Sequence, residues 1–329
     1  MQRRRLLAMQ LLAAPLLATP LLSLARPARA QAFPSRPLRI LVGFAAGGAS
    51  DTQARLVAAA MEKSLGQPVV VENRPGAGGN IAVDAVAKSP ADGYTFGAAS
   101  VSNLAINPHL YRSMPYDPLK DLAPLSLMAI NPNILVARPG FPASDLAGLI
   151  AHAKANPGKL SYGSPGSGTS QHMAAEMLKI TAGIDMAHVP YRGGAAAYPD
   201  LLSGRIDLLV DVFGTAWPQV QSGRIGAIAV LTPERLPLAP MVPTAAETLP
   251  GFVAVSWLGF VAPMGMPPAV LAQLAGAVQA AIRTPEVRAR ITESGSVPVG
   301  SSAEEFAKFI REEHARWLPA VRASGASVD

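Results

Sequence analysis

Two glycine-rich loops carry the strongest chemical signal in this sequence. The first, Gly43–Asp51 (GFAAGGASD), lies between a predicted strand and a predicted helix. Gly47 and Gly48 let the backbone turn sharply and approach a ligand closely, and Ser50 or Asp51 can cap the helix. The N–H groups of such a turn and the positive end of the helix dipole favour an anion. A plain strand-to-helix turn would show the same pattern, so this loop alone does not distinguish an anion-binding site from an ordinary turn.

The second loop, Gly163–Ser170 (GSPGSGTS), also lies between a predicted strand and a predicted helix. It offers hydroxyl and N–H groups at another helix N-terminus. Binding sites in open α/β sheets lie beyond the carboxyl ends of the strands, where both loops are expected. If the loops face each other across a cleft, each holds part of one anionic ligand.

Three further side chains merit attention. Arg192, in the segment YRGGA, can meet a carboxylate with two parallel hydrogen bonds, although an exposed arginine without that role fits equally well. Asp211 follows an apolar run and can accept a ligand donor, but a structural hydrogen bond is the stronger expectation. Trp257, in FVAVSWLGF, is expected to pack in a core or between domains.

The sequence gives little support for nucleotide binding, serine hydrolysis or metal binding. The loops match neither G-x-x-x-x-G-K-[ST] nor G-x-G-x-x-G, so no nucleotide cofactor is expected. The segment GTSQH lacks the second glycine of a G-x-S-x-G elbow, and His172 is expected to be a surface or packing residue. The chain has no cysteine, and its five histidines show no metal-ligand spacing, so no metal site is expected.

The net charge of +6 is concentrated in the first thirty residues. Arginines 3, 4, 5, 26 and 29 lie there without an acidic residue, which leaves the rest of the chain nearly neutral. A nucleic-acid surface would need clustered basic charge on the folded part. We therefore expect no nucleic-acid partner.

Residues 1–30 have the features of an export signal. A basic start precedes the apolar run 6–24, and Ala28–Ala30 is an A-x-A cleavage signal before Gln31. Pro15 and Pro20 argue against an uncleaved membrane anchor. RRRLL also resembles a twin-arginine signal, so the export route stays open. A periplasmic location is expected for the mature chain.

Strands and helices alternate along the mature chain, which predicts an α/β protein with mostly parallel sheets. No long flexible linker separates the two cycles of elements, which favours two lobes joined by crossing strands. The expected strands are 38–44, 69–71, 94–99, 134–137, 160–163, 186–190, 206–210, 225–231 and 253–261. The expected helices are 51–65, 81–87, 147–155, 171–180, 197–202, 269–282 and 303–323.

These motifs together resemble the tripartite tricarboxylate transporter family of extracytoplasmic solute receptors, also called Bug proteins. The resemblance covers the whole mature chain in family order. It includes VGFAAGGASD (42–51), ENRPGAGG (72–79), DGYTF (92–96), NPHLYRSMPYDPLKDLAP (107–124), YGSPGSGTSQHMAAEML (162–178), VPYRGG (189–194), LLSGRIDLL (201–209), VPTAAETLPGF (242–252) and FVAPMGMPP (260–268). Ala45 stands where many members have proline, which leaves the N–H groups of the loop available.

The resemblance implies a two-domain periplasmic-binding-protein fold of type II, with a ligand cleft between two α/β lobes. We expect lobe 1 at 31–132 plus 252–329 and lobe 2 at 133–251. The usual ligand is a small organic carboxylate, held by backbone N–H and hydroxyl groups. The site residues so implied are Phe44, Ala45, Ala46, Gly47, Gly48, Asp51, Ala99, Ser100, Ser164, Gly166, Ser167, Gly168, Thr169, Ser170, Tyr191, Arg192, Gly193 and Asp211.

The resemblance also implies a function. The expected protein is a monomeric receptor, not an enzyme, that delivers its ligand to the membrane components of a tripartite transporter. One rival is a sensor subunit that hands the ligand to a signalling protein. A second rival is an exported hydrolase using Ser164, Ser167 or Ser170, which needs a base within hydrogen-bond reach. The sequence shows no such partner.

Overall fold

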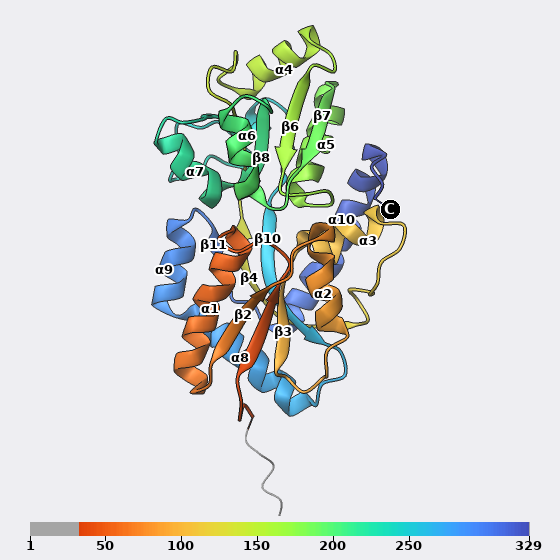
Figure 1. The fold of residues 1–329 in the computed structure, drawn as a ribbon, viewed down its shortest axis with the longest axis vertical. Coiled ribbons are helices and arrows are strands. Elements are labelled where there is room, and N and C mark those ends of the chain that lie inside the picture. The colour runs from red at the N-terminus through yellow and green to blue at the C-terminus, as the bar shows by residue number, and fades with distance from the viewer. Residues whose placement is uncertain (1–32, 329) are drawn as a thin grey trace, which may run out of the picture. The chain divides into compact units, whose positions relative to one another are not determined.

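The computed structural model describes residues 33–328 (Figure 1). The predicted export signal lies outside the described residues. The strands are β1 (Leu38–Val42), β2 (Val69–Asn73), β3 (Thr95–Ser100), β4 (Leu122–Asn131), β5 (Asn133–Ala137), β6 (Leu160–Ser164), β7 (Met186–Pro190), β8 (Leu208–Val212), β9 (Gly226–Val230), β10 (Ser256–Pro263) and β11 (Val297–Pro298).

The helices follow the same alternation. They are α1 (Ala49–Leu65), α2 (Asn80–Ala87), α3 (Asn107–Leu110), α4 (Leu146–Ala155), α5 (Ser170–Ala182), α6 (Tyr198–Leu202), α7 (Phe213–Gln221), α8 (Pro268–Arg283), α9 (Pro285–Glu293) and α10 (Ala303–Ser324). Short helical segments are η1 (Ala77–Gly79), η2 (Ser102–Ile106), η3 (Gly194–Ala197) and η4 (Ala245–Glu247). None of the helices within residues 33–328 is long and apolar enough to cross a bilayer.

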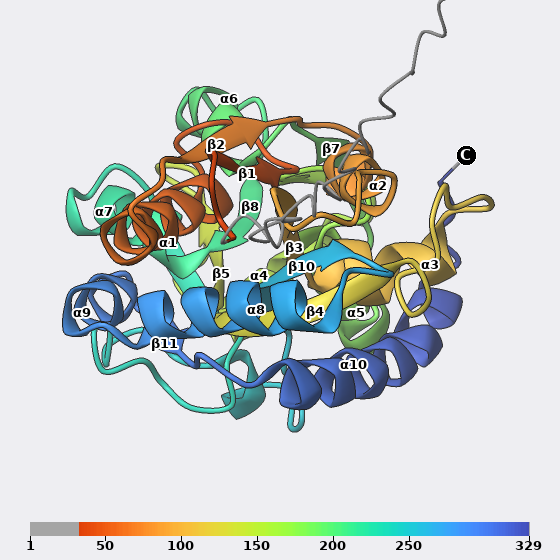
Figure 2. The same cartoon turned by 90° about the horizontal axis from the view of Figure 1, so that it is seen from below.

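The first sheet has the order β11-β4-β10-β3-β1-β2 within the described residues. Every residue of β10 is buried, because helices cover both faces of the sheet. Successive side chains of a strand point to opposite faces: Leu258 and Phe260 join the core under α1 and α8, whereas Trp257 and Val261 join the core under α10. Figure 2 shows α8 and α10 in different layers.

The second sheet has the order β7-β6-β8-β5-β9 within the described residues. One of its cores lies against α4 and α5, and another lies against α6 and α7. Both sheets are mixed. β1 pairs parallel to β2 and β3, and β6 pairs parallel to β7 and β8. The strands β4, β5, β9, β10 and β11 pair antiparallel.

The prediction of mostly parallel sheets is therefore wrong. The physical reason is the path of the chain, which leaves the first sheet through β4 and returns through β10. One hydrogen bond joins the two passages directly, from the Asn133 side chain to the Ala254 carbonyl at 2.9 Å. Leu231, just after β9, bridges them: its carbonyl accepts from the Ala254 N–H at 2.9 Å, and its own N–H donates to the Asn133 carbonyl at 2.8 Å. Crossing strands thus connect the sheets, as expected.

Several elements were not expected, among them β4, α7 and α9. β4 is a nearly continuous apolar segment interrupted by Pro124, and α7 contains Pro218, a residue that normally ends helices. α9 is short and begins at Pro285, where proline is well tolerated. In addition, β10 begins at Ser256, three residues later than the expected strand.

Candidate ligand site

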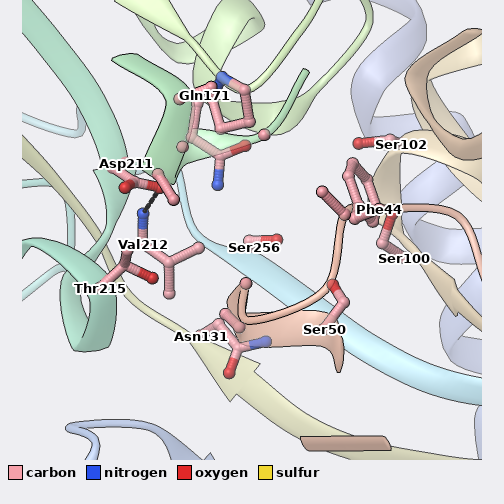
Figure 3. Close-up of a pocket in the computed structure, with 18 of the residues that line it drawn as sticks. Phe44, Ser50, Ser100, Ser102, Asn131, Gln171, Asp211, Val212, Thr215 and Ser256 are labelled. Atoms are coloured by element: carbon pink, nitrogen blue, oxygen red, sulfur yellow. Dashed lines mark hydrogen bonds between the residues drawn. The ribbon is translucent and has the colours of Figure 1, made fainter. Parts of the chain in front are cut away.

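A cavity of 390 Å³ is lined by residues that belong to both sheets and their loops (Figure 3). Those near the first sheet are Phe44, Ala45, Ala46, Gly48, Ala49, Ser50, Ser100, Ser102, Asn131, Ser256 and Trp257. Those near the second sheet are Pro165, Gln171, Arg192, Gly193, Gly194, Ala195, Ala196, Asp211, Val212 and Thr215. A ligand here would touch both parts of the chain.

The β1–α1 loop presents unused backbone donors to this cavity. Within residues 33–328, the amides of Phe44, Ala45 and Ala46 have no hydrogen-bond partner. The first turn of α1, which begins at Ala49, also leaves its N–H groups without partners inside the helix. These donors and the helix dipole suit the negative charge of a carboxylate.

Asp51 stabilises this loop through a hydrogen bond to its backbone. Gly48, rather than Ser50 or Asp51, is the N-cap of α1, and the Asp51 carboxylate instead accepts from the Gly47 N–H at 2.9 Å. Burial alone would raise the pKa of Asp51, but hydrogen bonds from Arg55, the Gly47 amide and Asn73 outweigh it and lower the pKa. The loop is thus held by an ionised carboxylate that lies outside the cavity.

Several polar groups of the second loop form hydrogen bonds within the loop or to the residues beside it. The amide of Gly166 donates to Ser164 Oγ, that of Gly168 to His172 Nδ1, and that of Thr169 to the Gly166 carbonyl. The Thr169 hydroxyl caps α5 by accepting from the His172 N–H. From this region, Pro165 and the Gln171 side chain line the cavity. The loop gives the site shape more than donors.

Neutral hydroxyls and one indole complete the wall. Within the described residues, the hydroxyls of Ser50, Ser102, Thr215 and Ser256 have no hydrogen-bond partner, so they remain free for a ligand. The Trp257 indole N–H donates to the buried Glu313 carboxylate at 2.8 Å, which fixes the ring in the wall.

The expected site residues divide between this cavity and its surroundings. Those that line the cavity are Phe44, Ala45, Ala46, Gly48, Ser100, Arg192, Gly193 and Asp211. Gly47 lines a neighbouring cavity beside α1 and α9, and Gly166, Ser167 and Tyr191 line another beside η1. The structure buries Asp51, Ala99, Ser164, Gly168, Thr169 and Ser170 behind the loops.

Comparison with known proteins decides the family. The model of the tripartite tricarboxylate transporter family receptor matches residues 53–326. The chain belongs to this family. Protein BugT of Bordetella pertussis is 36% identical over 307 residues, which cover 93% of this chain and 94% of BugT.

Solved structures agree with the family. An R. palustris protein with adipate has a TM-score of 0.86 at 35% identity, covering 90% of this chain and all of that one. The periplasmic binding protein BugD has a TM-score of 0.85 at 32% identity, covering 90% and 99% of the two chains. The expected two-lobed binding-protein fold is confirmed.

Several cavity residues of this receptor were not expected from the sequence. Asn131 and Ser256 lie at the ends of β4 and β10, which meet as antiparallel neighbours. Thr215 comes from the unexpected helix α7, and Gln171 follows the second loop. The apolar segment of β4 could have predicted a buried strand that ends at Asn131. Nothing local marks Thr215 or Ser256, since long-range pairing alone brings them to the cavity.

Ser164 has a possible base beside it, contrary to the sequence-based expectation. Its Oγ lies 2.7 Å from His188 Nε2. The hydroxyl is fully buried, however, and also lies 3.2 Å from both the Gly166 carbonyl oxygen and the Gly166 amide nitrogen. A nucleophile must reach its substrate, so this pair fits a structural role under the second loop. Within the described residues, no group of three or more metal-ligating side chains occurs.

His188 is partly buried and stacks with two buried rings. Its ring stacks on Tyr162 with centroids 4.9 Å apart and on His172 with centroids 4.1 Å apart. Burial lowers the pKa of His188 to about 3, and His172 and Lys179 add to the effect. Burial also lowers the pKa of His172, although Glu176 opposes this. Both rings are therefore neutral at neutral pH.

Acid should destabilise the receptor through this stack. An unfolded histidine takes up its proton near pH 6.5, but folded His188 does so only near pH 3. The free energy of unfolding is therefore not reduced by His188 well above pH 6.5. It falls as the pH drops below 6.5, by at most about 4 kcal/mol near pH 3. Urea unfolding from about pH 7 to 4 should show a shallower pH dependence in His188→Gln. The control His152→Gln should keep the wild-type slope, and an equal slope in His188→Gln would contradict the assignment.

Proposed function

We propose that this receptor captures a small organic carboxylate in the 390 Å³ cavity and delivers it to a tripartite tricarboxylate-type transporter. The observation that carries the proposal is the set of free amides of Phe44, Ala45 and Ala46 beside the first turn of α1. Oriented N–H groups supply a positive field without a buried cation. The adipate found in the related structure has the same chemistry.

Binding proceeds by hinge closure in this proposal. We place lobe 1 at 31–132 plus 252–329 and lobe 2 at 133–251, so that the hinge lies where β4 passes into β5 and where the chain returns to β10. The ligand carboxylate exchanges its water for the amides of lobe 1, and the segment 192–196 of lobe 2 closes over it. The proposed ligand-binding residues are those of the sequence-based expectation that line the cavity, and the amides of Phe44, Ala45 and Ala46 hold the carboxylate.

The biological setting follows from the family. Receptors of this family act with tripartite transporters, and we propose that residues 1–30 direct this one to the periplasm, where it works as a monomer without catalysing a reaction. Its partners are the carboxylate and the membrane components of the transporter. The buried Ser164 hydroxyl favours this role over hydrolysis.

The direct test is a thermal-shift screen of the chain from Gln31 to Asp329 against small acids and the matching neutral amides. A ligand that binds only the folded state raises the melting temperature by mass action. At a ligand concentration of 100 times its Kd, the free energy of unfolding increases by about 2.7 kcal/mol. We expect at least one acid to stabilise the chain and its fully amidated form to fail. Equal stabilisation by acid and amide would contradict the carboxylate site. The absence of a response to every acid would also contradict it, once mass spectrometry has shown that the protein carries no copurified ligand.

A further inference from the structure

Asn107 is a buried amide in the segment NPHLYRSMPYDP, which contributes no residue to the ligand cavity. It begins α3, is 0% exposed, and its Nδ2 donates to Asn80 Oδ1 at 2.8 Å. Within residues 33–328, its Oδ1 is buried and has no hydrogen-bond partner. Buried side-chain oxygens in native proteins nearly always have one, so the surroundings of this oxygen bear on its role.

The oxygen lies against the second loop. A Cβ atom added to Gly168 would be 2.3 Å from Asn107 Oδ1, so a hydrogen on the Gly168 Cα atom points at that oxygen. A C–H donor gives a weaker bond than an N–H or O–H donor. Leu110 of α3 lies on the same side, with its Cδ2 atom 3.2 Å from the same Cβ position. The contact thus joins α3, in proposed lobe 1, to the loop before α5, in proposed lobe 2.

A second contact between the proposed lobes lies beside the first. A Cβ atom at Gly78 would be 3.0 Å from the Ser167 carbonyl oxygen and 3.0 Å from Asn107 Nδ2. Neither Gly78 nor Gly168 therefore has room for a side-chain atom. Within the described part of the chain, no hydrogen bond joins the segments 77–79 and 107–110 to residues 167–168. The lobes touch closely here without a polar bond to hold them together.

The Asn107 side chain is held in its orientation from two sides. Its acceptor, Asn80 Oδ1, also accepts from the Tyr116 hydroxyl at 3.0 Å. Behind the contact, His109 Nε2 lies 2.8 Å from the His314 carbonyl oxygen, which ties α3 to α10 near the C-terminal end of the chain (Figure 1). Asn107 Oδ1 is thus kept aimed at the second loop.

We propose that Asn107 sets the cost of closing the receptor. This role rests on the proposed function, since it acts on the hinge closure that brings the second loop to α3. In the open form water reaches Asn107 Oδ1, whereas in the closed form the oxygen exchanges this water for the C–H group of Gly168. An acceptor buried without a full hydrogen bond opposes the form that buries it. Asn107 therefore holds the ligand-free receptor open until the contacts of the ligand outweigh this cost.

The cost of closure enters the measured affinity directly. When only a fraction of the ligand-free molecules is closed, the apparent affinity falls by that fraction. Removal of the Asn107 oxygen should raise the closed fraction and the affinity together. A residue that merely stabilises α3 would change the melting temperature and leave both of these quantities as they are.

The test follows affinity by calorimetric titration and closure by small-angle X-ray scattering. The probes are succinate, malate, adipate and benzoate. In Asn107→Ala, we expect each acid that binds the wild type to bind at least about five-fold more tightly. The radius of gyration of the ligand-free variant should be smaller than that of the wild type. The control is Tyr116→Phe, which removes another polar group of the same cluster and should change neither quantity.

Gly168→Ala tests the contact from the other lobe. Its Cβ atom would meet Asn107 Oδ1, so closure is hindered and affinity should fall at least about ten-fold. Adding Asn107→Ala removes the oxygen and should restore the affinity to within about three-fold of the wild type. The φ of +78° strains alanine in the open and closed forms alike, so it does not prevent this rescue. Gly183→Ala, at a φ of +63° with nothing within 4 Å, is the control for strain and should keep the wild-type affinity.

The outcomes keep the two proposals apart. Unchanged affinity and radius in Asn107→Ala, or a loss in Gly168→Ala that persists in the double variant, would overturn the role of Asn107 and leave the carboxylate receptor intact. If no acid binds the wild type, the carboxylate proposal fails, and the radius of ligand-free Asn107→Ala alone decides on Asn107. If Gly168→Ala does not fold, Asn107→Ala still decides. Tighter binding in Asn107→Ala together with rescue in the double variant would support the assignment.

Discussion

Gly194→Val should weaken ligand binding at least about 100-fold, which corresponds to about 2.7 kcal/mol. A Cβ atom at this position would lie 2.4 Å from both carboxylate oxygens of Asp211. Contacts this short are not tolerated in packed proteins, so either Asp211 or the segment around Gly194 must move. Both line the cavity, and either movement changes its shape.

Titration calorimetry with the best ligand from the screen measures this effect. The matched control is Gly226→Val in β9, where a Cβ atom meets nothing within 4 Å and the backbone suits a β-branched residue. Far-ultraviolet circular dichroism shows whether each variant is folded. A folded Gly194→Val protein with wild-type affinity would remove the segment 192–196 from the site.

The β1–α1 loop was the part of the site that local sequence described best. An apolar strand, a glycine pair and an amphipathic helix follow one another without interruption, so the pattern places Phe44, Ala45 and Ala46 at a strand end beside a helix N-terminus. The role of Gly47 was less visible. Its amide is used by Asp51, a partner that turn geometry alone does not reveal.

The second loop shows why composition is a weaker guide than hydrogen-bond accounting. Ser164, Thr169 and the nearby glycines look like ligand donors in the sequence, yet the structure satisfies many of their polar groups internally. His172 and His188 provide part of this internal network, and they come from different elements. The sequence could not predict the pairing, because the two rings meet only when β7 packs beside α5.

Antiparallel pairing accounts for the remaining differences between expectation and structure. Asn131 and Ser256 are directly opposite each other in the pairing of β4 with β10, although 125 residues separate them in the chain. Each residue looks unremarkable in its own segment. Their position in the cavity wall follows from the return of the chain to the first sheet, a long-range event that local periodicity does not encode.

Gly43→Ala should destabilise the fold by about 3 kcal/mol, roughly 5 °C in melting temperature for a chain of this size. The added Cβ would lie 2.6 Å from both the Cα and the carbonyl oxygen of Gly79. The backbone of Gly79 has little room to retreat, because it packs tightly against the Asn103 side chain, which donates to the Gly78 carbonyl at 2.8 Å. The strain therefore falls on the junction between β1 and the ligand-binding loop.

Thermal unfolding of the ligand-free protein measures this cost, and Gly276→Ala is the control. Gly276 is exposed within α8 and a Cβ atom there meets nothing within 4 Å, so alanine should stabilise the helix by up to about 1 kcal/mol. The two variants make the same chemical change with opposite expected signs. Wild-type melting of Gly43→Ala would mean that β1 and the segment 76–79 separate easily. The amides of Phe44, Ala45 and Ala46 would then have no rigid support, and their preorganisation for a carboxylate would have to arise on closure instead.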